Sequence, residues 1–491
     1  MARLLQRCMA TRPKLNALYP EQDQTQFSKA ILRNFGELET GEVPEALKFD
    51  RPVQMTTLSN QIRVATDHWP GPLATVGIMI EAGSRNESMS NAGTAHLLEH
   101  LHFKGTYRRS RIRLESEIED MGGNLNAYTS RETTLYQMQV FPRDVPRAMD
   151  IMTDMILNSK YDGKAVEQEL EVVLAEANEV DADRRELVLE NVHYAAYRDH
   201  QMGQPILGNR RSIPKLTSND LRTFVSTHYI GPRMVVVGGG PVDHQQLVDL
   251  TEKHMGKVAI SRPELSIIGE DEPLLTGSQV NIRDDDVDMT HMGLFFPAPS
   301  WKHPDYFAFL ILQRLMGDYD PKRDSLINHA RLQYNYLHTW LGENEDVGKH
   351  ECLYVPYKNS GLIGHYVSCL DLGAHLAAAG CMKAMRRATS YIMEAELYRA
   401  KNKIYNELLN TETGSEVIQT LASQLIYMNR RVPRSEIAKR ISSMDARFLE
   451  KTYTKWLWDC ELALAFYGPT FMVGRDYNIY RAFTNDQNLL L

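Results

Sequence analysis

The sequence predicts an α+β protein of two domains related by internal duplication. The chain has 491 residues, which is too long for one compact core and suits two domains of about 200 residues each. Residues 261–277, with Pro263, Pro273 and three consecutive acidic residues, are the best candidate for a linker. After this segment the order of predicted strands and helices starts again, which indicates a diverged duplication. Two unrelated α+β domains are the alternative.

The first domain, predicted to cover 51–260, alternates short β-rich stretches with longer helical patterns. Residues 54–66 predict two short strands around Ser59-Asn60, and 74–80 predict an apolar strand that stops at Gly83. The other predicted elements are helices around residue 96 and at 112–121, 145–157 and 164–181, and strands within 126–140 and at 233–238. We interpret the glycines at 238–240 as a turn after the last of these strands.

The second domain, predicted to cover 278–491, repeats this order more loosely. Residues 290–296 resemble the strand at 74–80, and the helical pattern at 306–315 takes the place of the helix around residue 96. The remaining predicted elements are strands at 361–370 and 462–468 and a long helix at 394–409.

The first residues differ in composition from the rest. Residues 1–20 contain no Asp or Glu, and they carry Arg3, Arg7, Arg12 and Lys14 among apolar residues. An acid-free, Arg-rich, amphipathic start is typical of a mitochondrial transit peptide, with a disordered basic arm as the alternative. Residues 21–50 are expected to form an N-terminal extension before the first strand.

Composition argues against several classes of protein. Hydrophobic residues make up 43% and charged residues 24%, as in a globular protein. A net charge of −8 argues against a nucleic-acid partner and is compatible with a cationic substrate. No stretch approaches the roughly 20 apolar residues that cross a bilayer, so we expect no direct membrane span. Five cysteines without CxxC spacing argue against a disulfide framework.

The residues with the clearest chemistry are His96, Glu99 and His100, within the string TAHLLEHLHFKGT. The two histidines are four apart, so on a helix they project from one face, about 40° apart, and can take adjacent vertices of a tetrahedral zinc site. Glu99 lies on the same side, where it can act as a general base on water. The order His-x-x-Glu-His is the inverzincin signature. A histidine pair beside a helical salt bridge is the alternative.

A zinc site needs a third protein ligand, and a carboxylate is expected. The predicted helix at 164–181 offers five glutamates: Glu167, Glu169, Glu171, Glu176 and Glu179. Glu169 and Glu176 are seven apart and therefore share one helix face. Spacing alone does not choose among the five.

Four motifs carry a family resemblance, namely TAHLLEHLHFKGT, GGNLNAYTSRETTLY (122–136), LEVVLAEANEVDAD (170–183) and THYIGPRMVVVGGG (227–240). In them the chain resembles the pitrilysin-type metallopeptidases, most closely the mitochondrial branch that contains processing-peptidase β subunits and core subunits of respiratory complex III. The resemblance runs from about 56 to 256 and is looser in the second half, where 356–367 matches best.

The resemblance implies a fold and a catalytic centre. It implies two homologous domains, each an antiparallel β-sheet covered by helices, the second without a metal site. It also implies one Zn²⁺ per chain held by His96, His100 and Glu176, with Glu99 as the base. Glu169 corresponds to an acid that supports the ligands.

The resemblance also implies substrate-binding residues. Glu186 and Glu190 match the acidic pair that recognises an arginine of the presequence, although relatives usually have Asp at the position of Glu190. Phe103 matches the aromatic position that receives the residue after the cleaved bond. The strand that an extended substrate joins by backbone hydrogen bonds corresponds to residues Asn126, Ala127 and Tyr128. His102 is a departure, since relatives usually have a small residue there.

Two functions remain open. The first is a zinc metalloendopeptidase that removes presequences, works with a homologous α subunit and lies in the mitochondrion, in the matrix or at the matrix side of the inner membrane. The alternative is a non-catalytic core subunit of complex III. The two are compatible, because in some lineages of the family the peptidase is built into complex III.

Overall fold

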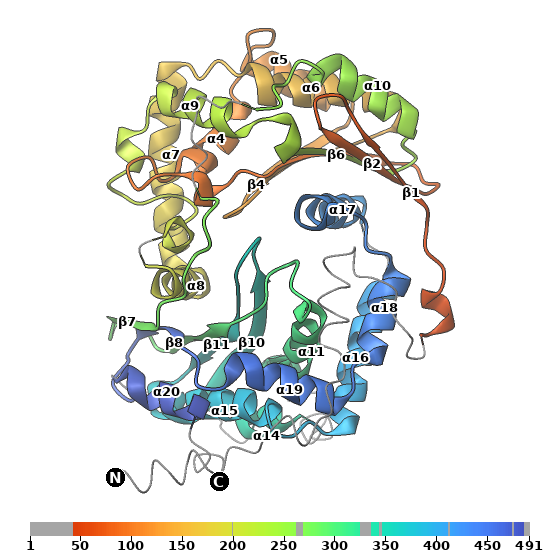
Figure 1. Ribbon diagram of the computed structural model, residues 1–491. Helices are drawn as coiled ribbons and strands as arrows, with labels where there is room; N and C mark the ends of the chain where they lie inside the picture. The colour runs from red at the N-terminus through yellow and green to blue at the C-terminus, as the bar shows by residue number, and fades with distance from the viewer. Residues whose placement is uncertain are drawn as a thin grey trace, which may run out of the picture.

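The computed structural model describes residues 43–198, 200–261, 269–324, 335–342, 346–410, 413–473 and 476–485. Within them the chain forms two six-stranded sheets, one from each half, with helices on their outer sides (Figure 1). The predicted transit-like segment 1–20, most of the extension 21–50 and residues 262–268 of the predicted linker lie outside the described residues.

The first half begins with strands and then alternates helices with the rest of its sheet. Its strands are β1 (Val53–Thr57), β2 (Arg63–His68), β3 (Ala74–Ile80), β4 (Asn124–Thr129), β5 (Thr134–Val140) and β6 (Met234–Gly240). Its helices are α4 (Thr94–His102), α5 (Arg111–Glu119), α6 (Val145–Asn158), α7 (Gly163–Ala182), α8 (Arg184–Ala196), α9 (Ser218–His228) and α10 (His244–Met255).

The second half has more helices at its C-terminal end. Its strands are β7 (Ser278–Arg283), β8 (Thr290–Pro297), β9 (Asp318–Tyr319), β10 (Val347–Pro356), β11 (Gly361–Cys369) and β12 (Ala463–Gly468). Its helices are α11 (Tyr306–Met316), α12 (Pro321–Asp324), α14 (Tyr336–Gly342), α15 (Asp371–Ala388), α16 (Glu394–Leu409), α17 (Gly414–Met428), α18 (Arg434–Ser443), α19 (Ala446–Leu457) and α20 (Tyr477–Asn485).

Five neighbouring strands of each sheet share one topology, and β1 and β9 are additional edge strands without a counterpart. The strand order is β1-β2-β6-β3-β5-β4 in the first and β7-β12-β8-β11-β10-β9 in the second. Each has one parallel pair, β2–β6 or β7–β12, and its other pairs are antiparallel. Matching β6 to β12, β3 to β8 and β5 to β11 reproduces the same connectivity in both halves. The predicted fold class, two homologous α+β domains, is therefore confirmed.

A helix of each half packs on the sheet of the other half. Helix α17 lies against β6 and β3 of the first sheet, where Ile418 and Leu425 are fully buried with Val235 and Val237 (Figure 1). Helix α8 lies against β12 and β8 of the second sheet. This exchange ties the two halves together through apolar burial, the largest stabilising contribution in a fold.

Equivalent glycines make room for both exchanged helices. A Cβ atom at Gly77 of β3 would stand 2.9 Å from Ile418 Cδ1 of α17, and one at Gly293 of β8 would stand 2.4 Å from Val192 Cγ2 of α8. Gly77 pairs with Val237 and Gly293 pairs with Ala465, at corresponding places in the two sheets. The close approach of each helix therefore depends on a missing side chain.

The interpretation of the glycines at 238–240 as a turn is wrong. All three are buried residues of strand β6 and pair with β2. A Cβ atom at Gly239 would stand 2.8 Å from Ile418 Cγ2 and 2.9 Å from the Trp69 ring. These glycines continue the strand beneath the exchanged helix, which local sequence could not reveal.

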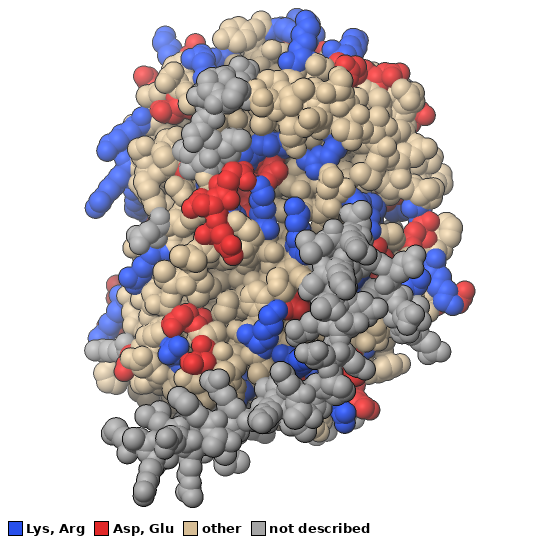
Figure 2. Space-filling view, viewed as in Figure 1, with Lys and Arg blue, Asp and Glu red and all other residues tan. Residues whose placement is uncertain are grey.

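Ion pairs join the two halves at their junction. Lys358 Nζ of the second half lies 2.8 Å from Glu81 and 2.6 Å from Glu270. The Lys358 backbone N–H donates to Glu132, which is buried and pairs with Arg85 at 2.6 Å. Figure 2 shows acidic side chains gathered on one face of the molecule with basic side chains beside them. The junction is therefore held by charge as well as by apolar packing.

Among the residues that the structure describes, no helix combines the length and the hydropathy that a bilayer crossing requires.

Candidate metal centre

Helix α4 carries the His-x-x-Glu-His motif and has a buried carboxyl group, that of Glu87, at its start. Gly93 precedes the helix with a φ of 101°, a conformation that favours glycine. The carboxylate of Glu87 accepts hydrogen bonds from the N–H groups of Gly93 at 2.8 Å and Ala95 at 2.7 Å. Burial raises the pKa of Glu87 to about 8. The first turn of α4 is thus fixed by a side chain that the sequence motif did not indicate.

Two flanks of α4 have opposite roles. Leu97, Leu98 and Leu101 are buried in the apolar core of the first half, 0–2% exposed. His96 and His100 point to the other side, toward helix α7, which packs against α4. The apolar flank therefore fixes the direction of the two imidazoles.

The ligand atoms of His96, His100 and Glu176 converge at one point. His96 Nε2 lies 3.2 Å from His100 Nε2 and 3.1 Å from Glu176 Oε2, and His100 Nε2 lies 3.3 Å from that oxygen. In a tetrahedral zinc site with bonds of about 2.0–2.1 Å, neighbouring ligand atoms stand about 3.3 Å apart. The donor set and its spacing therefore fit a zinc ion.

The other nitrogen of His100 faces a carboxylate. His100 Nδ1 lies 3.2 Å from Glu169 Oε2, and Lys104 Nζ lies 2.7 Å from Glu169 Oε1. A proton on Nδ1 donates to Glu169 and leaves Nε2 as a lone pair directed at Glu176 and His96. Glu169 is 6% exposed and its charge is balanced by Lys104. The arrangement orients one candidate metal ligand.

Glu99 lies on the same helix, half-buried, between the two histidines in sequence. No hydrogen bond or ion pair joins its carboxylate to another described residue. Burial and the nearby charge of Glu99 raise the pKa of Tyr229, which places the carboxylate close to that phenol. Glu99 therefore stands beside the centre without being tied to a partner.

His102 belongs to a different environment. It is fully buried, with Nδ1 2.6 Å from the Tyr136 hydroxyl and Nε2 2.9 Å from the Tyr161 hydroxyl. Burial lowers its pKa to about 3, so it is neutral. Both ring nitrogens are hydrogen-bonded within the core, so His102 packs the helix rather than binding metal.

The two acids expected to bind an arginine are not equivalent. Glu190 is mostly buried and pairs with Arg131 at 2.6 Å. Arg131 Nε also donates to the Met202 carbonyl, and the Arg131 side chain is 6% exposed. Glu186 at the start of α8 is 47% exposed and pairs with the neighbouring Arg185. Glu190 is therefore already bound to an internal arginine, whereas Glu186 faces solvent.

The residues expected to contact an extended substrate lie on β4 and at the end of α4. Strand β4, which contains Asn126, Ala127 and Tyr128, is at one edge of the first sheet and contacts helix α4. Tyr128 Oη accepts a hydrogen bond at 3.1 Å from Gln419 of the exchanged helix α17. Phe103 follows α4 and packs partly buried against the core of the first half.

Sequence reasoning missed two residues of this centre. Lys104 follows His100 by four positions, in the turn directly after α4, and this four-residue spacing is a signal that could have indicated it. Glu87 lies in a loop before the helix and gives no such signal. Both act on the motif helix or on a ligand rather than at the convergence point.

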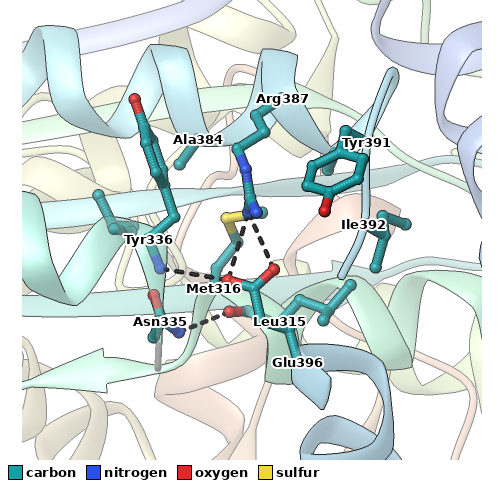
Figure 3. Close-up of a pocket in the computed structure, with 11 residues that line it drawn as sticks. Leu315, Met316, Asn335, Tyr336, Ala384, Arg387, Tyr391, Ile392 and Glu396 are labelled. Atoms are coloured by element: carbon teal, nitrogen blue, oxygen red, sulfur yellow. Dashed lines mark hydrogen bonds and ion pairs between the residues drawn. The ribbon is translucent and has the colours of Figure 1, made fainter. Parts of the chain in front are cut away.

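A small pocket lies in the second half, between α11, α14, α15 and α16 (Figure 3). Arg387 donates to both carboxylate oxygens of Glu396, and the Tyr336 N–H also donates to Glu396. Asn335 donates to the Leu315 carbonyl. These polar groups satisfy one another, so the pocket is not the candidate site.

Comparisons with known proteins agree with the fold and with the family resemblance. Residues 63–210 match the model of the insulinase family, peptidase family M16, and residues 215–404 match the model named peptidase M16 inactive domain. A mitochondrial-processing peptidase subunit beta of Lentinula edodes is 35% identical over 84% of this chain and 90% of its own length. The Rattus norvegicus protein of the same name is 34% identical over 88% of this chain and 87% of its own length.

A solved structure shares the fold. A chain of "Complex III2 from Candida albicans, Inz-5 bound" matches with a TM-score of 0.76 and 21% identity, over 88% of this chain and all of that chain. The resemblance inferred from the four sequence motifs is confirmed by these matches. The chain therefore belongs to the insulinase family of peptidases, family M16.

Proposed function

We propose that the chain is the catalytic β subunit of a mitochondrial processing peptidase, a zinc metalloendopeptidase that removes N-terminal presequences together with a homologous α subunit. The observation that carries this proposal is the convergence of His96, His100 and Glu176 at 3.1–3.3 Å, with Glu99 beside them and without a partner among the described residues. Relatives at 34–35% identity bear the name of this subunit. Because that name is of a mitochondrial protein, the proposal places this chain in the mitochondrion as well.

Each residue of the centre has a role in peptide hydrolysis. His96, His100 and Glu176 would hold the zinc ion, and Glu169 keeps the His100 ring in the tautomer that leaves Nε2 free. A zinc ion bound there would polarise the scissile carbonyl and make a water molecule acidic at neutral pH. Glu99 accepts the proton of that water and donates it to the leaving amine nitrogen.

Edge strand β4 would align the presequence. An edge strand has backbone N–H and C=O groups that an extended peptide can join as a further strand. Asn126, Ala127 and Tyr128 lie on this strand, and α4 is next to it. Phe103, at the end of α4, would contact the side chain that follows the cleaved bond.

The arginine of the presequence would meet Glu186 first. Glu186 is 47% exposed, so its carboxylate can approach a cationic side chain from solvent. Glu190 already pairs with Arg131 at 2.6 Å. It would therefore bind the substrate arginine only if that arginine replaced Arg131. We therefore expect Glu186 to contribute to substrate binding more directly than Glu190.

A second function has support from the structural match to a chain of complex III. The protein would then be a core subunit of that complex, with other complex III subunits as partners. The chain retains the complete donor set of the metal centre, which a purely structural subunit does not need. We therefore rank the peptidase first and regard an active subunit within complex III as compatible with it.

Metal removal tests the proposal. The full chain co-expressed with its α partner should cleave a synthetic presequence peptide that contains arginine, lose cleavage with a chelator and regain it when zinc is added. The same peptide with arginine replaced by glutamine is the substrate control. Absence of both cleavage and bound zinc in a correctly assembled pair would refute the peptidase and favour the structural core subunit.

A further inference from the structure

A second group of metal-ligating side chains lies in the core of the second half. His350 of β10, His365 of β11 and Cys381 of α15 each place one ligand atom within 4.8 Å of the others. All three side chains are 0% exposed. Strands β10 and β11 are neighbours and α15 packs against both, so the fold itself brings these residues together.

Each of the two imidazoles has a hydrogen-bond partner at only one of its two ring nitrogens. His350 Nε2 and His365 Nδ1 lie 2.8 Å apart and share one proton. The outer nitrogens, His350 Nδ1 and His365 Nε2, have no hydrogen-bond partner among the described residues. Buried polar atoms are normally paired, and an unpaired one destabilises the folded state. The cluster therefore lacks the partners that neutral buried histidines usually have.

The duplicated half shows that the fold does not need histidine at these positions. The strand registers of the two sheets place His365 where the first sheet has Tyr136, and His350 where it has Leu125. The first half thus fills the His350 position with an apolar side chain. The imidazole pair is a chemical departure within a repeated architecture, which points to a ligand rather than to packing.

We propose that His350, His365 and Cys381 bind one thiophilic transition-metal ion, zinc or monovalent copper, as a structural site of the second half. Thiolate and imidazole are the ligands that both ions accept in proteins. Binding replaces the hydrogen bond between the rings, and the Cys381 thiol releases its proton to solvent as the sulfur–metal bond forms. The site is independent of the proposed peptidase function.

The net charge of the occupied site distinguishes the two candidate ions. Monovalent copper with one thiolate has no net charge, which suits a core in which none of the three ligands has a carboxylate partner among the described residues. Divalent zinc needs a second thiolate for the same balance. Cys352 is buried and stands directly opposite His365 in the β10–β11 register, but its sulfur is not part of the cluster of three ligand atoms, so it would have to move toward them to serve as a fourth ligand.

Cobalt substitution detects this site selectively. A sulfur–cobalt bond gives a near-ultraviolet charge-transfer band, and the centre formed by His96, His100 and Glu176 contains no sulfur. The full chain loaded with Co²⁺ should show the band. Cys381→Ser should abolish it, whereas Cys460→Ser, a cysteine outside the cluster, should leave it unchanged. A band that persists in folded Cys381→Ser would overturn the assignment.

Metal counting then identifies the ion. In a Glu176→Gln background, which weakens the first centre, the stripped chain is loaded with Zn²⁺ or with Cu⁺ under reducing conditions. If Cys381→Ser loses the bound equivalent of metal and Cys352→Ser keeps it, the site has one thiolate, which indicates copper. If both variants lose the bound equivalent, the site has two thiolates, which indicates zinc. No retained equivalent of either ion in the folded background chain would refute the site.

A spectroscopic measurement protects the test against variants that do not fold. The Glu176→Gln chain loaded with the retained ion should give K-edge X-ray absorption with both sulfur and imidazole scattering. Scattering from light atoms alone would contradict a Cys381 ligand.

Discussion

The side chains His96, His100 and Glu176 come from two helices, and their exposure differs. His96 is buried, whereas the Glu176 side chain is 37% exposed. A catalytic zinc site keeps one position open for water and substrate, and the exposed Glu176 edge provides such an opening. Glu169 lies on the Nδ1 side of the His100 ring, away from the point where the three ligand atoms converge, and contacts none of those three atoms.

Glu169→Gln tests the role of that carboxylate. The amide keeps the shape but loses the charge that orients His100, so zinc affinity should fall about 10- to 100-fold. Zinc dissociation constants measured by chelator competition would show the change. Glu171→Gln, an exposed glutamate on the same helix, is the matched control and should bind zinc as wild type does. Equal affinities for all three chains would exclude the orienting role.

At the level of elements, sequence pattern was reliable where local signals were strong. The apolar run 74–80 and the helix 394–409 agree with β3 and α16 at both ends. Strand β10 was not predicted, because its charged stretch Lys349–Glu351 hides two buried core residues, His350 and Cys352. Burial of such residues depends on a neighbouring strand, which no local window contains.

Sequence predicted the candidate ligand set but not its surroundings. His96, Glu99 and His100 follow from spacing on one helix, whereas the choice of Glu176 among five glutamates needed the family resemblance. The pairing of Glu190 with Arg131, 59 positions away in sequence, follows only from the tertiary fold. The contact of α17 with the first sheet is likewise invisible to any local pattern.

Gly77→Ala tests the exchange of helices between the halves. A Cβ atom there would stand 2.9 Å from Ile418 Cδ1, so the free energy of unfolding should fall by about 1–3 kcal/mol. Urea denaturation measures the loss. Ile418→Val removes the clashing atom and should restore part of the stability in the double variant.

The control for this prediction is Gly163→Ala, since nothing lies within 4 Å of a Cβ atom at Gly163. That variant should keep wild-type stability. If Gly77→Ala were as stable as Gly163→Ala, helix α17 would not lie on the first sheet as closely as the structure has it.

For the whole molecule, buried histidines in different regions set the response to acid. Burial lowers the pKa of His228 in the first half to about 3, and burial also lowers the pKa of His193 at the contact of α8 with the second half. Both are neutral in the folded chain at pH 5, whereas in the unfolded chain a histidine binds a proton below about pH 6.5. The unfolded state therefore gains protons, and stability falls, as the pH decreases from about 6.5 toward 3.

The pH dependence gives a measurable prediction. The free energy of unfolding should fall between pH 7.5 and pH 5 by about 1–2 kcal/mol for each such histidine. His228→Gln should reduce this loss, and His375→Gln, which replaces an exposed histidine, should not. Urea midpoints at the two pH values report the difference. Identical pH dependence in wild type and His228→Gln would show that His228 is not held neutral.

The two halves divide the work of the proposed enzyme. The first half supplies the metal centre and the edge strand, and the second half contributes α17, whose Gln419 reaches Tyr128 on that strand. Ion pairs of Lys358 and the exchanged helices fix the halves relative to each other. The geometry of the centre therefore depends on the complete chain.

The central claim is that Glu99 moves the proton at a zinc ion held by His96, His100 and Glu176. The most direct measurement compares cleavage of the arginine-containing presequence peptide with bound zinc, in wild type, Glu99→Gln and Glu176→Gln, each assembled with the α partner. We predict that Glu99→Gln retains zinc and peptide binding but loses cleavage by at least about 100-fold, and that Glu176→Gln loses cleavage and binds one equivalent of zinc less than wild type. Cleavage by Glu99→Gln at the wild-type rate, or as much bound zinc in Glu176→Gln as in wild type, would contradict the account.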